Sequence, residues 1–123
     1  MLIRLHRLTV HCADLKRSVA FYRDVLGFPL KFEFADRAEF HSGPVTLVLR
    51  PDDSSESGTM RKEPARAGET RLEFEVLDLE KFCREKSEKG AEIISPLEGG
   101  DSQNRTAVLH DPDGLAIFVT EAS

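Results

Sequence analysis

The polar side chains most able to do chemistry in this chain recur at alternate positions of two segments. They are Arg7, Thr9 and His11 and, 64 residues further along, Arg71, Glu73 and Glu75. An arginine guanidinium binds carboxylates and phosphates through paired hydrogen bonds. Histidine and glutamate are common metal ligands and common general acids or bases. The two segments therefore indicate a site for an anionic organic ligand or, as an alternative, a metal site made from His11, Glu73 and Glu75.

No other catalytic constellation competes with these two segments. The glycine pair in residues 98–101 belongs to a short turn and does not open a helix, as a phosphate-binding loop would. No nucleophile elbow occurs in the sequence. Cys12 and Cys83 have no metal-binding or redox spacing, and we predict that they are buried thiols in a reducing compartment.

Composition narrows the class of protein further. With 123 residues, 40% of them hydrophobic, the chain is expected to form a single globular domain over residues 1–123. The 17 basic residues are outnumbered by 22 acidic ones, which argues against a nucleic-acid partner. No apolar run approaches the roughly 18 residues that a membrane helix needs, and the N-terminus lacks the apolar region of a signal peptide. We therefore expect a cytoplasmic protein without a membrane partner.

The first half of the chain must position the segment with Arg7. Alternation over residues 5–12 predicts a strand, and Asp14 is expected to cap a helix that Gly27 ends. Three short strands are predicted at residues 30–34, 37–41 and 45–50, with a turn at residues 42–44. This first module spans about residues 3–50. Residues 51–69 are polar and rich in turn-forming residues, which is typical of a connector.

The second half repeats the same order over about residues 70–121. A strand at residues 71–76 precedes a helix that Asp78 caps and that Gly90 ends. Strands follow at residues 93–94, 106–110 and 115–121, the last two joined by the turn at residues 111–114. The pair Asp14-Leu15 recurs as Asp78-Leu79, again 64 residues apart. The sequence therefore predicts an α+β fold of two tandem β-α-β-β-β modules, in which one sheet face is free to curve around a cavity.

Two motifs resemble those of a known family. Residues 14–28, DLKRSVAFYRDVLGF, resemble the opening helix of vicinal-oxygen-chelate proteins, and residues 111–114, DPDG, resemble the turn before their last strand. The resemblance covers nearly the whole chain except the connector. It implies the glyoxalase/bleomycin-resistance fold, a curved eight-stranded sheet that is usually dimeric, with modules exchanged between subunits in some cases. The family includes lyases, epimerases, ring-cleaving dioxygenases, fosfomycin-modifying transferases and metal-free drug-binding proteins.

The resemblance also indicates where a metal would bind. Counting from the helix caps and the turn glycines, the four ligand positions of the family correspond to Arg7, Leu47, Arg71 and Phe118. Arginine stays protonated and offers no lone pair, and leucine and phenylalanine carry no ligand atom. We therefore expect no bound metal and no other cofactor.

From these residues we predict a metal-free protein that binds a small, anionic organic molecule in the concave sheet. The apolar walls of the site are expected from Leu47, Leu49 and Phe118. The polar contacts are expected from Arg7, Thr9, His11, Arg71 and Glu73. The alternative is a lyase, isomerase or dioxygenase with a rebuilt metal site, or a metal-free catalyst with His11 or Glu73 as base.

Some polar residues also have purely structural explanations. Arg71 would only stabilise the sheet if it paired with Glu73 or Glu75. His41 and His110, near strand ends, are expected at the surface, and Glu121 is expected to be solvated.

Overall fold

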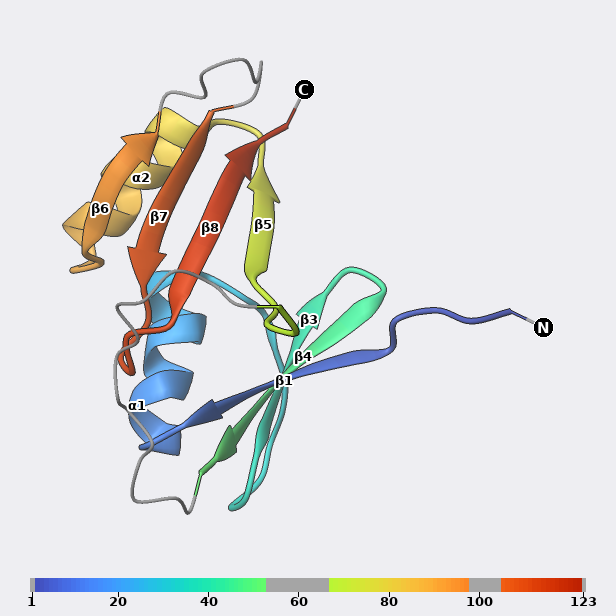
Figure 1. The fold of residues 1–123 in the computed structure, drawn as a ribbon. Helices are drawn as coiled ribbons and strands as arrows, with labels where there is room; N and C mark the ends of the chain where they lie inside the picture. The colour runs from blue at the N-terminus through green and yellow to red at the C-terminus, as the bar shows by residue number, and fades with distance from the viewer. Residues whose placement is uncertain (1, 53–66, 98–104, 123) are drawn as a thin grey trace. The chain divides into compact units, whose positions relative to one another are not determined.

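A computed structural model of the protein describes residues 2–52, 67–97 and 105–122. The chain divides into two compact units, Met1–Thr59 and Met60–Ser123, and each contains one predicted module (Figure 1). Most of the expected connector, residues 53–66, and the expected turn at residues 98–101 lie outside the described residues. Among the helices of the described residues, none has the length and apolar character needed to cross a membrane.

The two units share one strand order. In the first, β1 (Arg7–Cys12) precedes α1 (Leu15–Ala20), the π-helical turn η1 (Phe21–Val25), β2 (Leu30–Glu33), β3 (Ala38–Ser42) and β4 (Val45–Pro51). In the second, β5 (Leu72–Val76) precedes α2 (Leu79–Glu88), β6 (Ile93–Leu97), β7 (Thr106–His110) and β8 (Ala116–Glu121). The strands form two four-stranded sheets with the orders β1-β4-β3-β2 and β5-β8-β7-β6. The predicted fold class and the internal duplication are confirmed.

Both helices begin and end where the sequence predicts. The Asp14 carboxylate accepts a hydrogen bond from the Arg17 amide at 3.1 Å, and the Asp78 carboxylate accepts one from Lys81 at 3.0 Å. These bonds satisfy amides that a helix start otherwise leaves without a partner. Gly27 and Gly90, after the helices, have φ values of 89° and 96°, which side chains with a Cβ rarely adopt.

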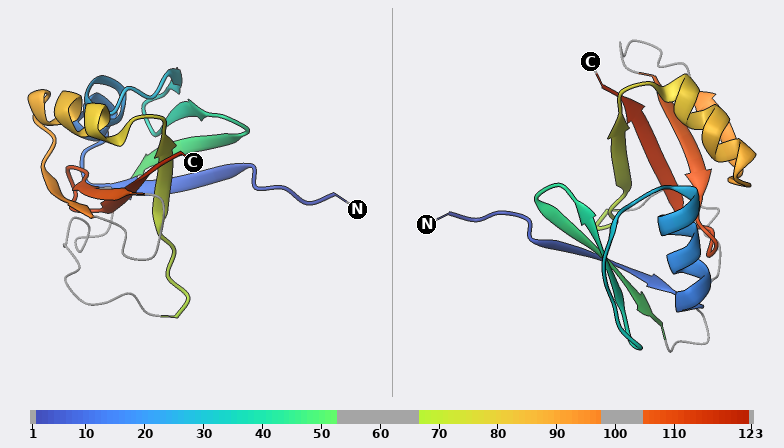
Figure 2. Two further views of the ribbon diagram at one scale, coloured as in Figure 1. Left: turned by 90° about the horizontal axis from the view of Figure 1, so that it is seen from above. Right: turned by 180° about the vertical axis from the view of Figure 1, so that it is seen from behind.

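The helical segment of the first unit covers one face of its sheet (Figure 2). Tyr22 is fully buried, and its ring centroid lies 6.2 Å from that of Phe40 on β3. Phe40 pairs with Leu47 on β4, and Leu47 pairs in turn with Leu8 on β1. Because paired residues point to the same side of a sheet, these side chains form the core beneath the helix.

The structure corrects the expected placement of Leu47 and Leu49. Both were expected on the face of Arg7, but they are 1% and 0% exposed and lie in the core beneath the helix. The register between β1 and β4 instead aligns Thr9 with Val48. Shifting the alternation by one residue moves every side chain of a strand to the opposite face. Val48 therefore takes the place expected for Leu47.

In the second unit, a carboxylate from the last strand completes the start of α2. Leu79, the first residue of α2, is buried, and its amide donates a hydrogen bond to Glu121 Oε2 at 3.0 Å. Arg105 donates a second hydrogen bond to the same oxygen at 3.3 Å. These bonds hold the pKa of Glu121 below its usual value, the bond from the Leu79 amide most of all. The expectation that Glu121 is simply solvated is wrong, because the carboxylate accepts a helix-end amide.

Candidate functional site

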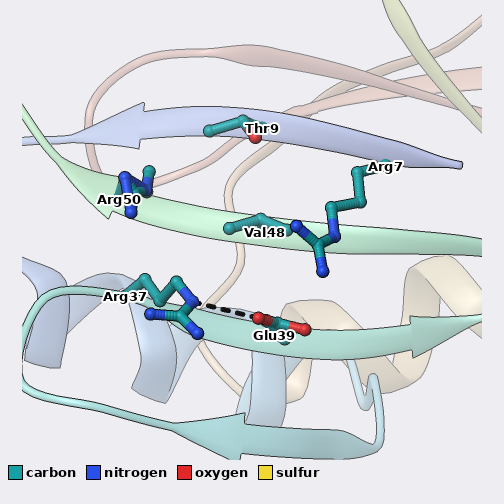
Figure 3. A pocket seen from close by; sticks show the side chains of 6 residues that line it. All are labelled: Arg7, Thr9, Arg37, Glu39, Val48 and Arg50. Carbon is teal, nitrogen blue, oxygen red and sulfur yellow. Dashed lines mark hydrogen bonds and ion pairs between the residues drawn. The ribbon is translucent and has the colours of Figure 1, made fainter.

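The face of the first sheet opposite its helical segment carries an open depression of about 400 Å³ (Figure 3). Its lining comes from β1, from β4 and from the start of β3. The lining residues are Arg7, Thr9, Arg37, Glu39, Val48 and Arg50. Glu39 and Val48 are paired across β3 and β4, and Thr9 and Val48 across β1 and β4. The register of three neighbouring strands, together with Arg37 just before β3, therefore builds the depression.

The depression is lined by three guanidinium groups and one carboxylate. Glu39 is 5% exposed, and Arg37 Nε donates a hydrogen bond to its Oε2 at 3.0 Å. This hydrogen bond lowers the pKa of the Glu39 carboxyl, and the charges of Arg7 and Lys31 lower it further, although burial opposes the shift. The carboxylate is therefore ionised at neutral pH and compensates about one of the three positive charges.

The three arginines differ in how fully they are engaged. Arg37 is held by Glu39 and also lies 3.5 Å from Asp36. Arg50 has a longer ion pair with Asp36, at 3.9 Å. Arg7 has neither a hydrogen bond nor an ion pair with any residue of the described ranges. Figure 3 shows its side chain reaching from β1 across Val48 toward Glu39. Arg7 is therefore the guanidinium best placed to bind an added anion.

Several predicted site residues lie on this same face. Arg7 and Thr9 line the depression. His11 follows them on β1, is exposed, and is paired with Arg50 on β4. Of the first-module residues in the predicted site, only Leu47 and Leu49 lie on the other face.

The equivalent face of the second unit is occupied by contacts within that unit. The guanidinium carbon of Arg71 lies 4.2 Å from the ring centroid of Phe118. Its Nη2 also donates a hydrogen bond to Glu73 at 3.1 Å, and the two side chains are 61% and 47% exposed. Arg71 and Arg7 hold equivalent positions in their modules. Arg71 precedes Leu72, which is paired with β8, as Arg7 precedes Leu8, which is paired with β4. The structural pairing considered for Arg71 is thus present, and it distinguishes Arg71 from Arg7.

Within the described ranges, neither unit brings together three His, Cys, Asp or Glu side chains as a metal site would require. The alternative site from His11, Glu73 and Glu75 draws on both units and stays a hypothesis. Cys12 is buried, and its thiol lies 3.5 Å from the Arg50 carbonyl oxygen. Cys83 is half-buried, and burial raises the pKa of its thiol, which disfavours the reactive thiolate.

Sequence reasoning missed four of the six lining residues, namely Arg37, Glu39, Val48 and Arg50. A signal for two of them was present in β4. Thr46, Val48 and Arg50 alternate with the more apolar Val45, Leu47 and Leu49. Because Thr46 and Arg50 are polar, this set of alternate residues indicates the face of the strand that points away from the core. Arg37 and Glu39 required knowledge of how β3 pairs with β4.

A tandem β-α-β-β-β fold with a polar sheet face opposite the helix defines the class of protein, and comparison with known proteins identifies the family. The model of the glyoxalase/bleomycin resistance protein/dioxygenase superfamily matches residues 4–119. The chain therefore belongs to this superfamily. It is 31% identical to YwkD, an uncharacterized protein of Bacillus subtilis (strain 168), over 131 aligned residues that cover 98% of each chain.

Solved structures show the same fold. TnmS3, an antibiotic binding protein from Streptomyces sp. CB03234, has a TM-score of 0.78 at 20% identity, covering 99% of this chain and 98% of that one. Lactoylglutathione lyase from Agrobacterium tumefaciens has a TM-score of 0.73 at 20% identity, covering 97% and 93%. At such identities the similarity concerns the fold alone, so function must be argued from the site.

Proposed function

We propose that this protein binds a small organic molecule with a carboxylate or phosphate group in the depression of the first unit, without a metal ion. The observation that carries the proposal is the excess of positive charge in the depression, whose lining has three guanidinium groups and only one carboxylate. Membership of a superfamily whose fold also serves an antibiotic binding protein supports an organic ligand.

The depression assigns different roles to its residues. Arg7 contacts the anionic group directly, because its guanidinium has neither a hydrogen bond nor an ion pair with any described residue. Arg37 stays bonded to Glu39 and contributes positive charge from a fixed position. Thr9 and Val48 form the floor beneath the ligand. An arginine suits this role because its fork of N–H donors matches the two oxygens of a carboxylate or phosphate.

The other predicted contacts remain part of this proposal. His11 lies on the same face as Arg7 and is exposed, so it is a polar contact at the edge of the depression. On the equivalent face of the second unit, Arg71 contacts both Glu73 and Phe118, and we retain these three as ligand contacts from that unit. Their internal contacts make them weaker candidates than Arg7.

We also propose that the protein is a homodimer in the cytoplasm. Three apolar side chains precede β1, which is an edge strand of its sheet. They are Leu2, Ile3 and Leu5, with exposures of 89%, 84% and 63%. Exposed apolar residues that extend an edge strand are commonly covered by another chain.

The proposal is tested by calorimetric titration of the protein with a panel of carboxylates and phosphates. The wild type is compared with Arg7→Met and with Arg84→Met, which removes the same charge from an exposed position on α2. We expect an anion to bind and only Arg7→Met to weaken it. Equal losses in both variants, or no anion binding at all, would contradict the proposal. Metal analysis of protein purified without chelators tests the enzyme alternative, which one stoichiometric divalent ion would favour.

A further inference from the structure

Two phenylalanines on β2 and just after it are exposed although nothing in the proposed function uses them. Phe32 is 50% exposed and Phe34 is 44% exposed. Their ring centroids lie 5.8 Å apart with an angle of 32° between the ring planes. A pair of large apolar rings at an exposed position is uncommon enough to indicate a contact surface.

A β-bulge directs Phe32 to the face that carries the depression. Leu30 pairs with Phe40 in the core, but Phe32 pairs with Glu39, so β2 contains one residue more than β3 at this point. Without the extra residue Phe32 would follow Leu30 to the face beneath the helix, because alternate residues share a face. The bulge therefore places the ring of Phe32 beside Glu39, a lining residue of the depression.

Positive charges flank both rings. The guanidinium carbon of Arg37 lies 4.2 Å from the ring centroid of Phe34, and the ammonium group of Lys31 lies 5.8 Å from that of Phe32. Arg37 also lines the depression, so the aromatic pair is continuous with the cationic site. An apolar surface next to three guanidinium groups suits a molecule with an aromatic body and an anionic end.

We infer that the ligand is an aryl carboxylate or aryl phosphate, with its anionic group on Arg7 and its ring against Phe32 and Phe34. This inference rests on the proposed function and specifies its ligand class. Neighbouring strands are about 4.8 Å apart, and Arg7 reaches toward Glu39, one strand from Phe32. The ring and the anionic group should therefore be roughly 5–10 Å apart, which corresponds to a short alkyl spacer.

A small ligand explains the surface better than a second copy of the chain. In a twofold dimer through this face the same patch would meet itself. Lys31, Arg37 and Arg50 would then approach their own copies, and like charges repel. An aromatic anion, by contrast, would cover the rings of Phe32 and Phe34 and also compensate the positive charge beside them.

The inference is tested by titrating the protein with phenylpropanoate and with cyclohexylpropanoate, which share the carboxylate and the spacer but carry a flat aromatic ring and a saturated ring, respectively. Because aromatic contacts add stabilisation beyond apolar burial, we expect the wild type to bind phenylpropanoate about three- to tenfold more tightly. The double variant Phe32→Leu, Phe34→Leu should lose this preference and still bind the saturated acid. Phe82→Leu on α2, whose ring also lies beneath a lysine, is the matched control and should keep the preference.

The outcomes separate the two proposals. If the wild type binds both acids equally, or if the double variant keeps the preference for phenylpropanoate, the aromatic inference is wrong but the proposed anion site is not contradicted. Binding of neither acid overturns the aromatic inference, and the anion site is contradicted only if the full panel of carboxylates and phosphates also fails to bind. A fall in molecular mass of the double variant in light scattering also overturns the inference, because it shows that the rings join two copies of the chain.

Discussion

Replacement of Arg7 by Met is expected to weaken anion binding while leaving the stability of the fold nearly unchanged. Arg7 is exposed, and within the described residues its guanidinium has neither a hydrogen bond nor an ion pair to lose. Methionine preserves the unbranched apolar part of the side chain across Val48. Substitutions at such exposed positions usually change the free energy of unfolding by about 0.5 kcal/mol or less.

The expected loss of affinity follows from the contact that Arg7 makes with the ligand. A hydrogen bond to a charged group contributes about 1.5–3 kcal/mol. Arg7, Thr9 and Arg50 in the lining are exposed, so water screens the interaction and the lower end of this range applies. A loss of about 1.4 kcal/mol corresponds to a tenfold increase in Kd.

Arg37→Met provides the contrasting result. This substitution leaves the buried Glu39 carboxylate without its hydrogen-bond donor at 3.0 Å, so it should lower the free energy of unfolding by about 1.5 kcal/mol. Calorimetric titration measures affinity and urea unfolding measures stability for both variants. If Arg7→Met unfolds as readily as Arg37→Met and binds anions as the wild type does, Arg7 is part of the scaffold and the reasoning is refuted.

Four further results are expected. The pKa of the Glu39 carboxyl is lowered in the folded protein, so its ion pair stabilises the fold above the usual pKa near 4.5 and is lost as the pH falls through the lowered value. In urea unfolding below about pH 5, the stability of Glu39→Gln should therefore fall less than that of the wild type. Parallel falls in the stability of the two proteins would contradict this expectation. Glu121→Gln should lower Tm, because the Leu79 amide loses a charged acceptor, and an unchanged Tm would show that water replaces the carboxylate. Because the ion pair between Arg71 and Glu73 is exposed, Arg71→Met should change the free energy of unfolding by less than about 1 kcal/mol. It should also weaken anion binding less than Arg7→Met does. A larger loss of affinity in Arg71→Met than in Arg7→Met would show that the anion binds to the second unit. Light scattering should report twice the 13.8 kDa chain mass, and a monomer at micromolar concentration would contradict the homodimer.

The fold was predictable because its signals are local. The Asp14 and Asp78 caps, and the glycines that follow the helices, mark helix boundaries through hydrogen bonds and backbone conformations that involve only neighbouring residues. The repetition of the caps 64 residues apart, and of the glycines 63 residues apart, also predicted two copies of one module, and the strand orders of the two sheets agree with it.

The candidate site was only partly predictable because it depends on register. Arg7 and Thr9 follow from alternation in a single strand, and both line the depression. Placing Leu47 by its distance from the turn glycine erred by one residue, which was enough to move it to the other face. The bulge that exposes Phe32 on the site's face depends on pairing with β3 and leaves no pattern in β2 alone.

A crystal structure of the protein grown with phenylpropanoate tests the central claim most directly. We predict that the carboxylate lies within hydrogen-bond distance of the Arg7 guanidinium, above Thr9 and Val48 on the face of the first sheet opposite its helical segment. An ordered molecule bound elsewhere while this face stays empty would contradict it.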